Sequence, residues 1–230
     1  MLTLAIDTAT KVCTVALCRE KTILAEYTIN MGHTHSEGLL PQLDQLLART
    51  GVQKSEIELI AVSMGPGSFT GLRIGLATAE AMAYSWQCYL HGVDTLKALA
   101  CNLPLEGVVL SPVLDAQKGN FYQALYQWEN GKLVELAPVA VVSAEQALER
   151  MALTGTQSLL LGECEKLVKK GLPDFIKAAP EALRMPRASS AALLAQDEFD
   201  ADNDRKIFGL EPYYIRRSEA EELWEKKHKQ

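Results

Sequence analysis

Each half of the chain opens with the same short pattern: an apolar strand that ends in aspartate, a tight turn and a second strand. Leu4–Asp7 is followed, nine and ten residues after its aspartate, by an Ala-Leu pair, and Pro112–Asp115 is followed by an Ala-Leu pair at the same distance. A third strand and then helices come next in both halves. The repeat predicts two duplicated lobes, residues 1–103 and 104–230, and this order of strands and helices predicts α/β layers.

Hydrophobic periodicity and turn residues place the elements of both lobes. The first lobe is expected to contain strands at Leu2–Ile6, Cys13–Cys18, Thr22–Thr28, Ile57–Ser63 and Tyr89–Val93, and helices at Thr34–Thr50 and Thr70–Trp86. The second is expected to contain strands at Val108–Asp115, Asn120–Trp128, Lys132–Ala140 and Ser158–Leu161, and helices at about 143–151, Glu165–Lys170 and Ser189–Phe199. Thr34 with Glu37 fits a capping box at the start of the first helix, and Gly51 is expected to end it. Pro41 either kinks this helix or moves its start to about Leu39. Ser143 and Gln146 can cap the helix that ends at about Met151. The tail from Ser218 to Gln230 is predicted to be a short solvated helix or a frayed end.

The composition is that of a globular protein without a basic surface for nucleic acid. The 230 residues are 48% hydrophobic and 23% charged, with a formal net charge of −6. A protein that grips RNA by itself normally carries an excess of positive charge. Any contact with RNA is therefore expected to be indirect, through another chain.

The sequence also indicates a cytoplasmic location. The N-terminal residues are predicted to form a strand and not a secretory signal, and no window reaches the ~18 apolar residues that span a bilayer, so no membrane is expected as a partner. The chain has five cysteines and no CxxC pair. This usage favours reduced, buried thiols inside the cell.

The two aspartate hairpins could bind phosphate or could simply close their turns. A tight turn presents backbone N–H groups to phosphate oxygens, and a carboxylate at a strand end can hold the counter-cation. This interpretation assigns Asp7, Thr8 and Asp115 to a nucleotide. Aspartate is also a common turn residue, so the alternative is that both aspartates cap their hairpins.

The loop from Gly65 to Gly71 places three glycines and a proline between a strand and a helix. A helix N-terminus after such a loop can hold an anion. The loop is no P-loop, because no Lys-Ser/Thr follows its last glycine, and its glycine spacing is one residue too long for a dinucleotide fingerprint. Ser68 lacks the flanking residues of a nucleophile elbow. Ligand contact and a tight turn for close helix packing therefore remain equal alternatives.

The helix after this loop is rich in small residues, which permit a neighbouring backbone to approach closely. They are Gly71, Gly75, Ala77, Ala79, Ala81 and Ala83. Such a face can pack on the sheet of its own lobe or against a helix of a second subunit. The leucine-striped helix at Thr34–Thr50 is the natural companion in either case.

The histidines do not form a metal motif. His33 and His35 share one loop without a third ligand nearby, so they are expected to cap the following helix or to remain solvated. No H-E-x-x-H is present. No metal site is expected, and a peptidase would find neither its metal triad nor its nucleophile.

An ordered set of motifs resembles the TsaB family of bacteria. The motifs are Ala5-Ile6-Asp7-Thr8-Ala9, His33-Thr34 with Leu39-Leu40-Pro41, Gly65–Arg73 and Asp115-Ala116, and more loosely Glu211–Arg216, which is similar to the family's closing strand. The resemblance implies the ASKHA fold, two RNase H-like lobes of the actin/Hsp70/sugar kinase superfamily. It also implies a role in making N6-threonylcarbamoyladenosine on tRNA, as the non-catalytic partner of the transferase TsaD and the small ATPase TsaE.

The resemblance further implies that the first two helices form the interface with TsaD. It assigns this interface to Leu39, Leu43, Leu46, Gly71, Gly75, Ala79 and Met82. The same helix pair would form a homodimer when the chain is alone, because a large apolar surface seldom stays bare.

Two departures from catalytic relatives imply a degenerate nucleotide site and an inactive chain. Thr95 and Leu99 stand where TsaD carries two metal-binding histidines, and Glu163 follows Gly162 where a nucleotide binder of this fold usually shows a second glycine. The chain is expected to have no cofactor of its own, although the hairpins could contribute to ATP or ADP at a subunit junction. The alternative is an active ATP-dependent small-molecule kinase or ATPase of the same fold.

Overall fold

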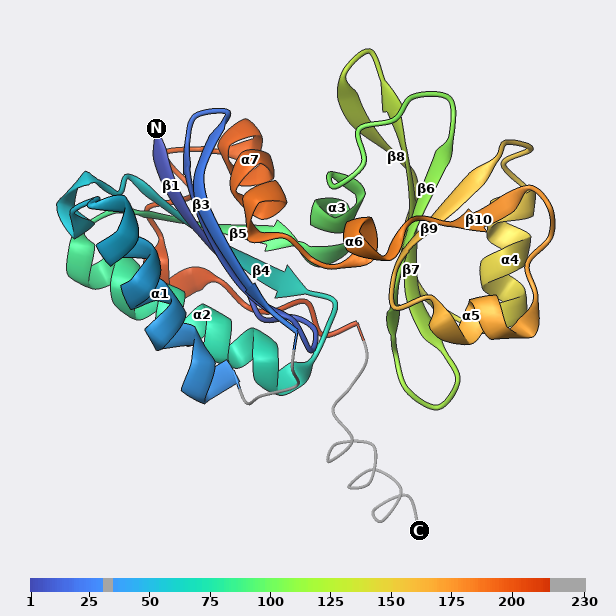
Figure 1. The fold of residues 1–230 in the computed structure, drawn as a ribbon, viewed down its shortest axis with the longest axis horizontal. Coiled ribbons are helices and arrows are strands. Elements are labelled where there is room, and N and C mark those ends of the chain that lie inside the picture. The colour runs from blue at the N-terminus through green and yellow to red at the C-terminus, as the bar shows by residue number, and fades with distance from the viewer. Residues whose placement is uncertain (31–34, 216–230) are drawn as a thin grey trace, which may run out of the picture.

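The computed structural model describes residues 1–30 and 35–215 (Figure 1). Within these residues none of the helices combines the length and the apolarity that a membrane crossing requires. Thr34, which the sequence predicts to cap the first helix, and the predicted helix at Ser218–Gln230 lie outside the described residues.

The described chain forms two five-stranded sheets with the same topology. The first contains β1 (Leu2–Asp7), β2 (Cys13–Arg19), β3 (Thr22–Ile29), β4 (Leu59–Gly65) and β5 (Tyr89–Asp94), in the order β3-β2-β1-β4-β5. The second contains β6 (Val109–Asp115), β7 (Phe121–Glu129), β8 (Lys132–Val142), β9 (Ser158–Gly162) and β10 (Ile176–Ala178), in the order β8-β7-β6-β9-β10. In both sheets the first three strands pair antiparallel and the last two add in parallel. The prediction of duplicated lobes is confirmed.

The two hairpins differ in length by one residue. Asp7 pairs with Thr14 across the first hairpin, whereas Asp115 pairs with Phe121 across the second. The Ala-Leu pairs that follow each aspartate at equal distance therefore do not occupy equivalent positions in the two sheets. The evidence for duplication is the shared strand order, and not the equal spacing of the Ala-Leu pairs.

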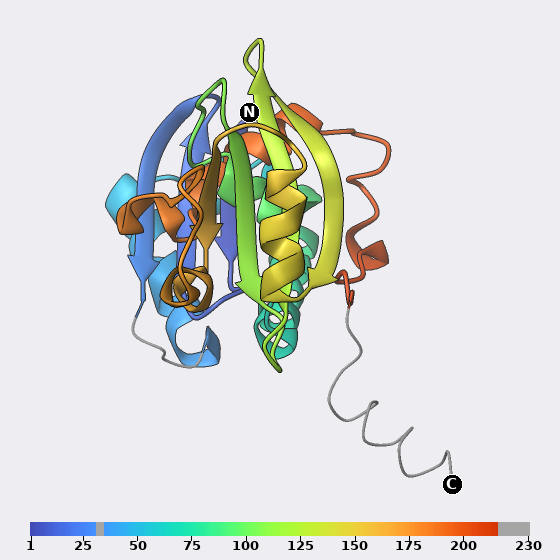
Figure 2. The ribbon, with the colours of Figure 1, turned by 90° about the vertical axis from the view of Figure 1, so that its right-hand side faces the viewer.

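Helices cover both faces of each sheet (Figures 1 and 2). The outer face of the first sheet carries α1 (His35–Thr50) and α2 (Phe69–Trp86), and the outer face of the second carries α4 (Ala144–Ala152) and α5 (Glu165–Lys170). Between the sheets lie α7 (Ala188–Glu198), which packs on the first sheet, and α3 (Thr95–Ala100), which packs on the second. Smaller elements are α6 (Glu181–Arg184) and the 3-10 turns Lys54–Glu56 and Ile207–Gly209.

The first helix runs without interruption through Pro41. It begins at His35, so the predicted later start near Leu39 is not observed. Proline removes one backbone donor, which leaves the carbonyl of Glu37 without its helical partner. Both residues are exposed, so water can serve that carbonyl. The predicted stop at Gly51 is confirmed, because this residue has a φ of +69°.

The chain returns to the first lobe after the second sheet. Helix α7 buries Ala188, Ala191 and Ala195 against the first sheet. Glu26 of β3 anchors the start of this helix, since its carboxylate accepts hydrogen bonds from the Arg187 guanidinium and from Ser189 N. The predicted second lobe of residues 104–230 is therefore corrected, because residues 188–198 belong structurally to the first.

Residues after α7 continue along the first lobe. Leu90 N donates to Asp204 O at 3.0 Å, and Tyr213 N donates to Met64 O at 2.7 Å. The closing strand expected at Glu211–Arg216 is not formed within the described residues 211–215, which make this one backbone hydrogen bond and no ladder. The short elements α3, β10 and α6 are not among those that the sequence predicts.

Candidate functional site

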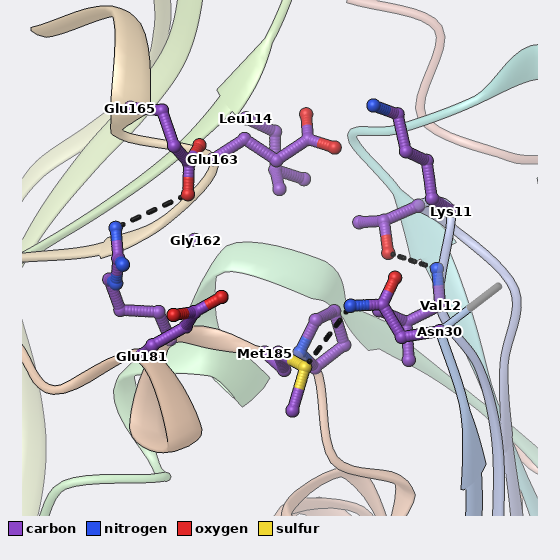
Figure 3. A pocket seen from close by; sticks show the side chains of 12 residues that line it. Lys11, Val12, Asn30, Leu114, Gly162, Glu163, Glu165, Glu181 and Met185 are labelled. Atoms are coloured by element: carbon purple, nitrogen blue, oxygen red, sulfur yellow. Dashed lines mark hydrogen bonds and ion pairs between the residues drawn. The ribbon is translucent and has the colours of Figure 1, made fainter. Parts of the chain in front are cut away.

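The candidate site is a cavity of about 220 Å³ between the two lobes. Figure 3 shows Lys11 and Asn30 of the first lobe on one side and Glu163, Glu165 and Glu181 of the second on the other. Both aspartate hairpins lie close to this cavity, since Thr10 and Leu114 belong to its lining. A ligand shared by the hairpins would have to bind here.

Asp7 is buried inside the first lobe, and both of its carboxylate oxygens accept hydrogen bonds there. One carboxylate oxygen accepts a hydrogen bond from Ala9 N at 2.9 Å, and the other accepts from Ser63 Oγ at 2.6 Å. Burial raises the pKa of this carboxyl above its ordinary value, and the bonds from Ser63 and Ala9 offset part of that rise. Asp7 closes its hairpin, as the capping alternative predicts.

Thr8 joins the first hairpin to helix α2. Its hydroxyl donates to the carbonyl of Gly71 at 2.8 Å, and the side chain is 1% exposed. A Cβ at Gly75 would lie 2.4 Å from Thr8 Oγ1, which only the absence of a side chain permits. Thr8 therefore packs against α2 and does not line the cavity.

The glycine loop packs on the backbone of the same hairpin. A Cβ at Gly67 would lie 2.3 Å from Ala9 O, and one at Gly71 would lie 2.1 Å from Thr8 O. Ser68 N donates to Ala9 O, and the Ser68 hydroxyl accepts from Gly71 N and so caps α2. Of the two alternatives for this loop, the structure supports close packing.

Asp115 is the more accessible of the two aspartates, but it is also paired. One oxygen accepts from Gln117 N at 2.9 Å, and the other lies 2.6 Å from Lys166 Nζ. The hydrogen bond to Asp115, and then the charges of Asp115 and Glu163, raise the pKa of the exposed Lys166 ammonium. Sequence reasoning missed Lys166, because a lysine on a short helix carries no signal of its partner.

Glu163 reaches back into the second hairpin from the end of β9. Its Oε2 accepts a hydrogen bond from Asp115 N at 2.9 Å, and its own N–H donates to Val113 O at 2.8 Å. The preceding Gly162 has a φ of +76°, and a Cβ there would lie 2.2 Å from Val113 O. The lone glycine noted in the sequence is required by this contact between β9 and β6.

Acidic side chains outnumber basic ones in the lining of the cavity. Its lining carries three carboxylates, Glu163, Glu165 and Glu181, and Arg184 is already paired with Glu165 at 3.2 Å. Phosphate groups would meet these negative charges in a partly enclosed space, where repulsion is stronger than in water. Asp7, Thr8 and Asp115 are not brought together as a ligand set, so the structure does not support their predicted role.

Thr95 and Leu99, which stand where TsaD has metal-binding histidines, pack inside the protein. Thr95 and Leu99 are buried, and Thr95 Oγ1 accepts from Gly65 N at 3.2 Å. Among residues 1–30 and 35–215, no three His, Cys, Asp or Glu side chains are placed to hold a metal ion. His35 binds the carbonyl of Thr10 through Nε2 at 2.7 Å, while His33 lies outside the described residues.

The side chains predicted to form the interface are mostly buried, so the prediction of these residues is corrected. Leu39, Leu43, Leu46, Gly71, Gly75 and Ala79 are buried in the first lobe, and the half-buried Met82 packs against the same core. These residues fix α1 and α2 on their own sheet. The exposed face of the two helices is formed instead by residues such as Leu40, Ala77, Ala81 and Tyr84.

A second polar cluster lies at the edge of the first sheet. His91 Nδ1 is 2.9 Å from Asp204 Oδ1, and His91 Nε2 is 3.5 Å from Glu198, which also pairs with Lys97. Burial lowers the pKa of His91, but the hydrogen bonds and charges of Glu198 and Asp204 outweigh it, so the pKa lies above its ordinary value. The cluster ties α7 and the chain after it to β5 and α3.

Comparison with known proteins connects this geometry to a family. Residues 22–224 match the family model of TsaD, the tRNA N6-adenosine threonylcarbamoyltransferase. The tRNA threonylcarbamoyladenosine biosynthesis protein TsaB of Bacillus subtilis is 35% identical over 97% of this chain and 98% of its own length. The protein of the same name from Escherichia coli is 30% identical over 97% of this chain and 96% of its own length.

A solved structure shares the whole arrangement. It is an uncharacterized protein from Pseudomonas aeruginosa described as similar to peptidase YeaZ, with a TM-score of 0.76 and 25% identity over 94% of this chain and 99% of that one. Together with the duplicated sheets, it confirms the predicted fold of two RNase H-like lobes of the actin/Hsp70/sugar kinase superfamily. The chain belongs to the TsaB family, as its motifs predict, within the wider family that the TsaD model describes.

Proposed function

We propose that this chain is the non-catalytic subunit of the complex that makes N6-threonylcarbamoyladenosine at the adenosine next to the anticodon of tRNA. In that complex it binds and activates the TsaD transferase, together with the TsaE ATPase, in the cytoplasm. The observation that carries the proposal is the likeness to named TsaB proteins over nearly the whole chain. No second function is favoured by any feature of the site.

The non-catalytic role is supported by the state of the cavity between the lobes. A kinase or ATPase of this fold needs a carboxylate free to hold the cation and backbone N–H groups free to bind phosphate. Here Asp7 is buried and Asp115 is paired with Lys166, while Glu163 takes the Asp115 N–H. Any nucleotide at a junction with another subunit would need ligands from that subunit.

The proposed binding surface for TsaD is the exposed face of α1 and α2. These helices lie side by side on the outside of the first lobe, away from the second lobe (Figure 1). Ala77 and Ala81 are exposed one turn apart on α2, which lets a partner helix approach closely, and Leu40 and Tyr84 are each 60% exposed. The chain also matches the TsaD model, so a related helix pair is expected on TsaD itself.

The same face would join two copies when TsaD is absent, because it is the natural site of a symmetric contact. The net charge of −6 makes direct gripping of tRNA unfavourable, so tRNA is expected to contact mainly the other subunits.

The proposal is tested by mixing the purified chain with TsaD of the same organism and measuring the mass of the product by size-exclusion chromatography with light scattering. A defined complex is expected, together with no ATP hydrolysis by the isolated chain. Two separate peaks at micromolar concentration would contradict the role as a TsaD subunit. Turnover of ATP by the chain alone would instead favour the kinase or ATPase alternative.

A further inference from the structure

A separate cavity of about 220 Å³ lies within the first lobe, between the β2–β3 hairpin and the first two turns of α1. Its wall includes Cys13 of β2, Ile29 of β3 and three residues of α1, which are His35, Gly38 and Gln42. The cavity therefore belongs to one lobe alone and needs no second subunit to form.

Gln42 places a buried amide without hydrogen-bond partners at this cavity. The residue is 4% exposed, and neither its Oε1 nor its Nε2 is bonded to any described residue. The amide lies near the Cys13 thiol, since it offsets part of the rise that burial causes in the pKa of that thiol, but sulfur is only a weak hydrogen-bonding partner. A buried amide without partners is costly and rare in a native protein. Because Gln42 lines the cavity, a group that satisfies its amide has to come from there.

His35 adds a third unpartnered polar atom to the same cavity. Its Nε2 lies 2.7 Å from the carbonyl oxygen of Thr10, and its Nδ1 is buried without a partner. A carbonyl oxygen can only accept, so Nε2 carries the proton and the neutral ring leaves Nδ1 as an acceptor. Six buried side-chain nitrogen and oxygen atoms of the described residues lack a partner, and three of them belong to His35 and Gln42. Unsatisfied polar atoms are therefore concentrated at this cavity.

Gly38 keeps space open between these two side chains. The three residues are spaced i, i+3 and i+7 along α1, so they lie on one face of the helix. Glycine inside a helix is less favourable than alanine. A Cβ at Gly38 would lie 3.6 Å from Gln42 Nε2, an ordinary contact, and would meet no atom of another element within 4 Å. The described packing around α1 would thus accept alanine here, and the missing side chain adds to the cavity.

The unpartnered atoms offer two acceptors and one donor group, whichever way the Gln42 amide is turned. The acceptors are His35 Nδ1 and Gln42 Oε1, and the donor is Gln42 Nε2. Their complement is a group with two N–H donors and one acceptor oxygen, which is a primary carboxamide. The exposed charges of Lys11 and Glu37 cancel in the lining, so an uncharged ligand is favoured over an ion. A cavity of about 150 Å³ can hold a benzene ring, so this one has room for a carboxamide on a small apolar body.

We propose that this cavity is a binding site for a small uncharged molecule that carries a primary carboxamide. The carboxamide forms a reciprocal pair of hydrogen bonds with the Gln42 amide and donates its second N–H to His35 Nδ1. The apolar part of the ligand lies against Cys13 and Ile29. The inference does not rest on the proposed role beside TsaD, because every residue of the site comes from this chain.

The test is a titration of the isolated chain with benzamide, followed in NMR spectra by the side-chain amide signals of Gln42 and the backbone amide signals of α1. Acetophenone has a methyl group in place of the amide nitrogen, and benzoate has a charged oxygen there, so both keep the shape but lose the N–H donors. Benzamide should shift the Gln42 signals in a saturable way, with an affinity at least about tenfold higher than that of either analogue. The absence of a saturable shift, which would mean that water alone fills the cavity, would overturn the proposal, and so would equal affinity for benzamide and acetophenone.

Two variants change the cavity, and a third serves as their control. Gln42→Met removes both polar atoms of the amide at nearly constant size, and Gly38→Ala places a methyl group in the cavity. Each should weaken benzamide binding by at least about tenfold, as measured on the α1 signals, while the chain still unfolds cooperatively in urea. Gln45→Met replaces an exposed glutamine of the same helix outside this cavity and should leave the affinity unchanged. Undiminished binding in a folded Gln42→Met or Gly38→Ala variant would refute the site.

Discussion

The Thr8 hydroxyl donates a hydrogen bond to the carbonyl oxygen of Gly71 at 2.8 Å, and this bond ties the first hairpin to the first turn of α2. The small residues of α2 accommodate this contact, because the Gly71 and Gly75 backbones press on Thr8. The glycine loop, which resembles a ligand-binding loop in the sequence, therefore serves to pack α2 against the first hairpin of the same lobe. It holds the outer helix pair in the position from which that pair can meet a partner.

Replacing Thr8 with valine tests this joint. The shape is kept, but the buried Gly71 carbonyl loses its side-chain donor, so the free energy of unfolding should fall by about 1–2 kcal/mol. Urea denaturation followed by circular dichroism measures the change. The control is Thr70→Val, an exposed position at the start of the same helix, which should change stability by less than about 0.5 kcal/mol. Equal effects at both positions would show that the hydrogen bond contributes nothing.

Replacing Gly75 with alanine should destabilise the lobe by about 1–3 kcal/mol, because the new Cβ overlaps Thr8 Oγ1. The clash should be relieved when Thr8 is also replaced by alanine, so the two substitutions are expected to couple and not to add. A double-mutant cycle on the same unfolding curves measures this coupling. Additive effects would mean that Gly75 is needed for some other reason.

A charged side chain on the exposed face of α2 should block the complex with TsaD while leaving the fold intact. Ala81→Arg places a long, charged group on the surface proposed for the partner helix, so affinity should fall by at least about tenfold, which is 1.4 kcal/mol. The matched control is Ala152→Arg, an exposed alanine on α4 of the other lobe. Unchanged affinity in Ala81→Arg with an unchanged melting temperature would remove α2 from the interface.

The His91 cluster predicts a dependence of stability on pH. The pKa of His91 is raised in the folded chain, so its stabilising effect is fully present below the unfolded pKa of about 6.5 and is lost as pH rises through the higher folded value. The difference in melting temperature between wild type and His91→Gln should therefore be larger at pH 6 than at pH 9. Asp94, whose pKa burial raises to about 6, titrates in both proteins and largely cancels in the difference. A constant difference over this range would contradict the account.

The sequence predicts the fold well where periodicity and turn chemistry agree. The alternation of apolar residues gives nine of the ten strands found in the described part of the chain, and the capping box at Ser143 and Gln146 correctly starts α4. The elements that were missed are short, such as β10 with three residues and α6 with four, and so small a segment shows no period. The return of α7 to the first sheet is a tertiary contact that no local pattern contains.

The candidate site was harder to predict, because the sequence shows residue types but not their partners. Asp7 and Asp115 look alike at the ends of matching strands, yet one is buried against Ser63 and the other pairs with Lys166. The family resemblance assigns the leucines and small residues of the outer helices to an interface. They are apolar because they face their own sheet, and the surface left for a partner lies on the opposite side.

The central claim, that this chain is a required but non-catalytic subunit, is tested most directly by reconstituting tRNA modification from purified TsaD, TsaE and the enzyme that supplies the threonylcarbamoyl donor. Incorporation of labelled threonine into tRNA should depend on adding this chain, and the chain without TsaD should give no product. Equal incorporation with and without the chain would contradict the claim.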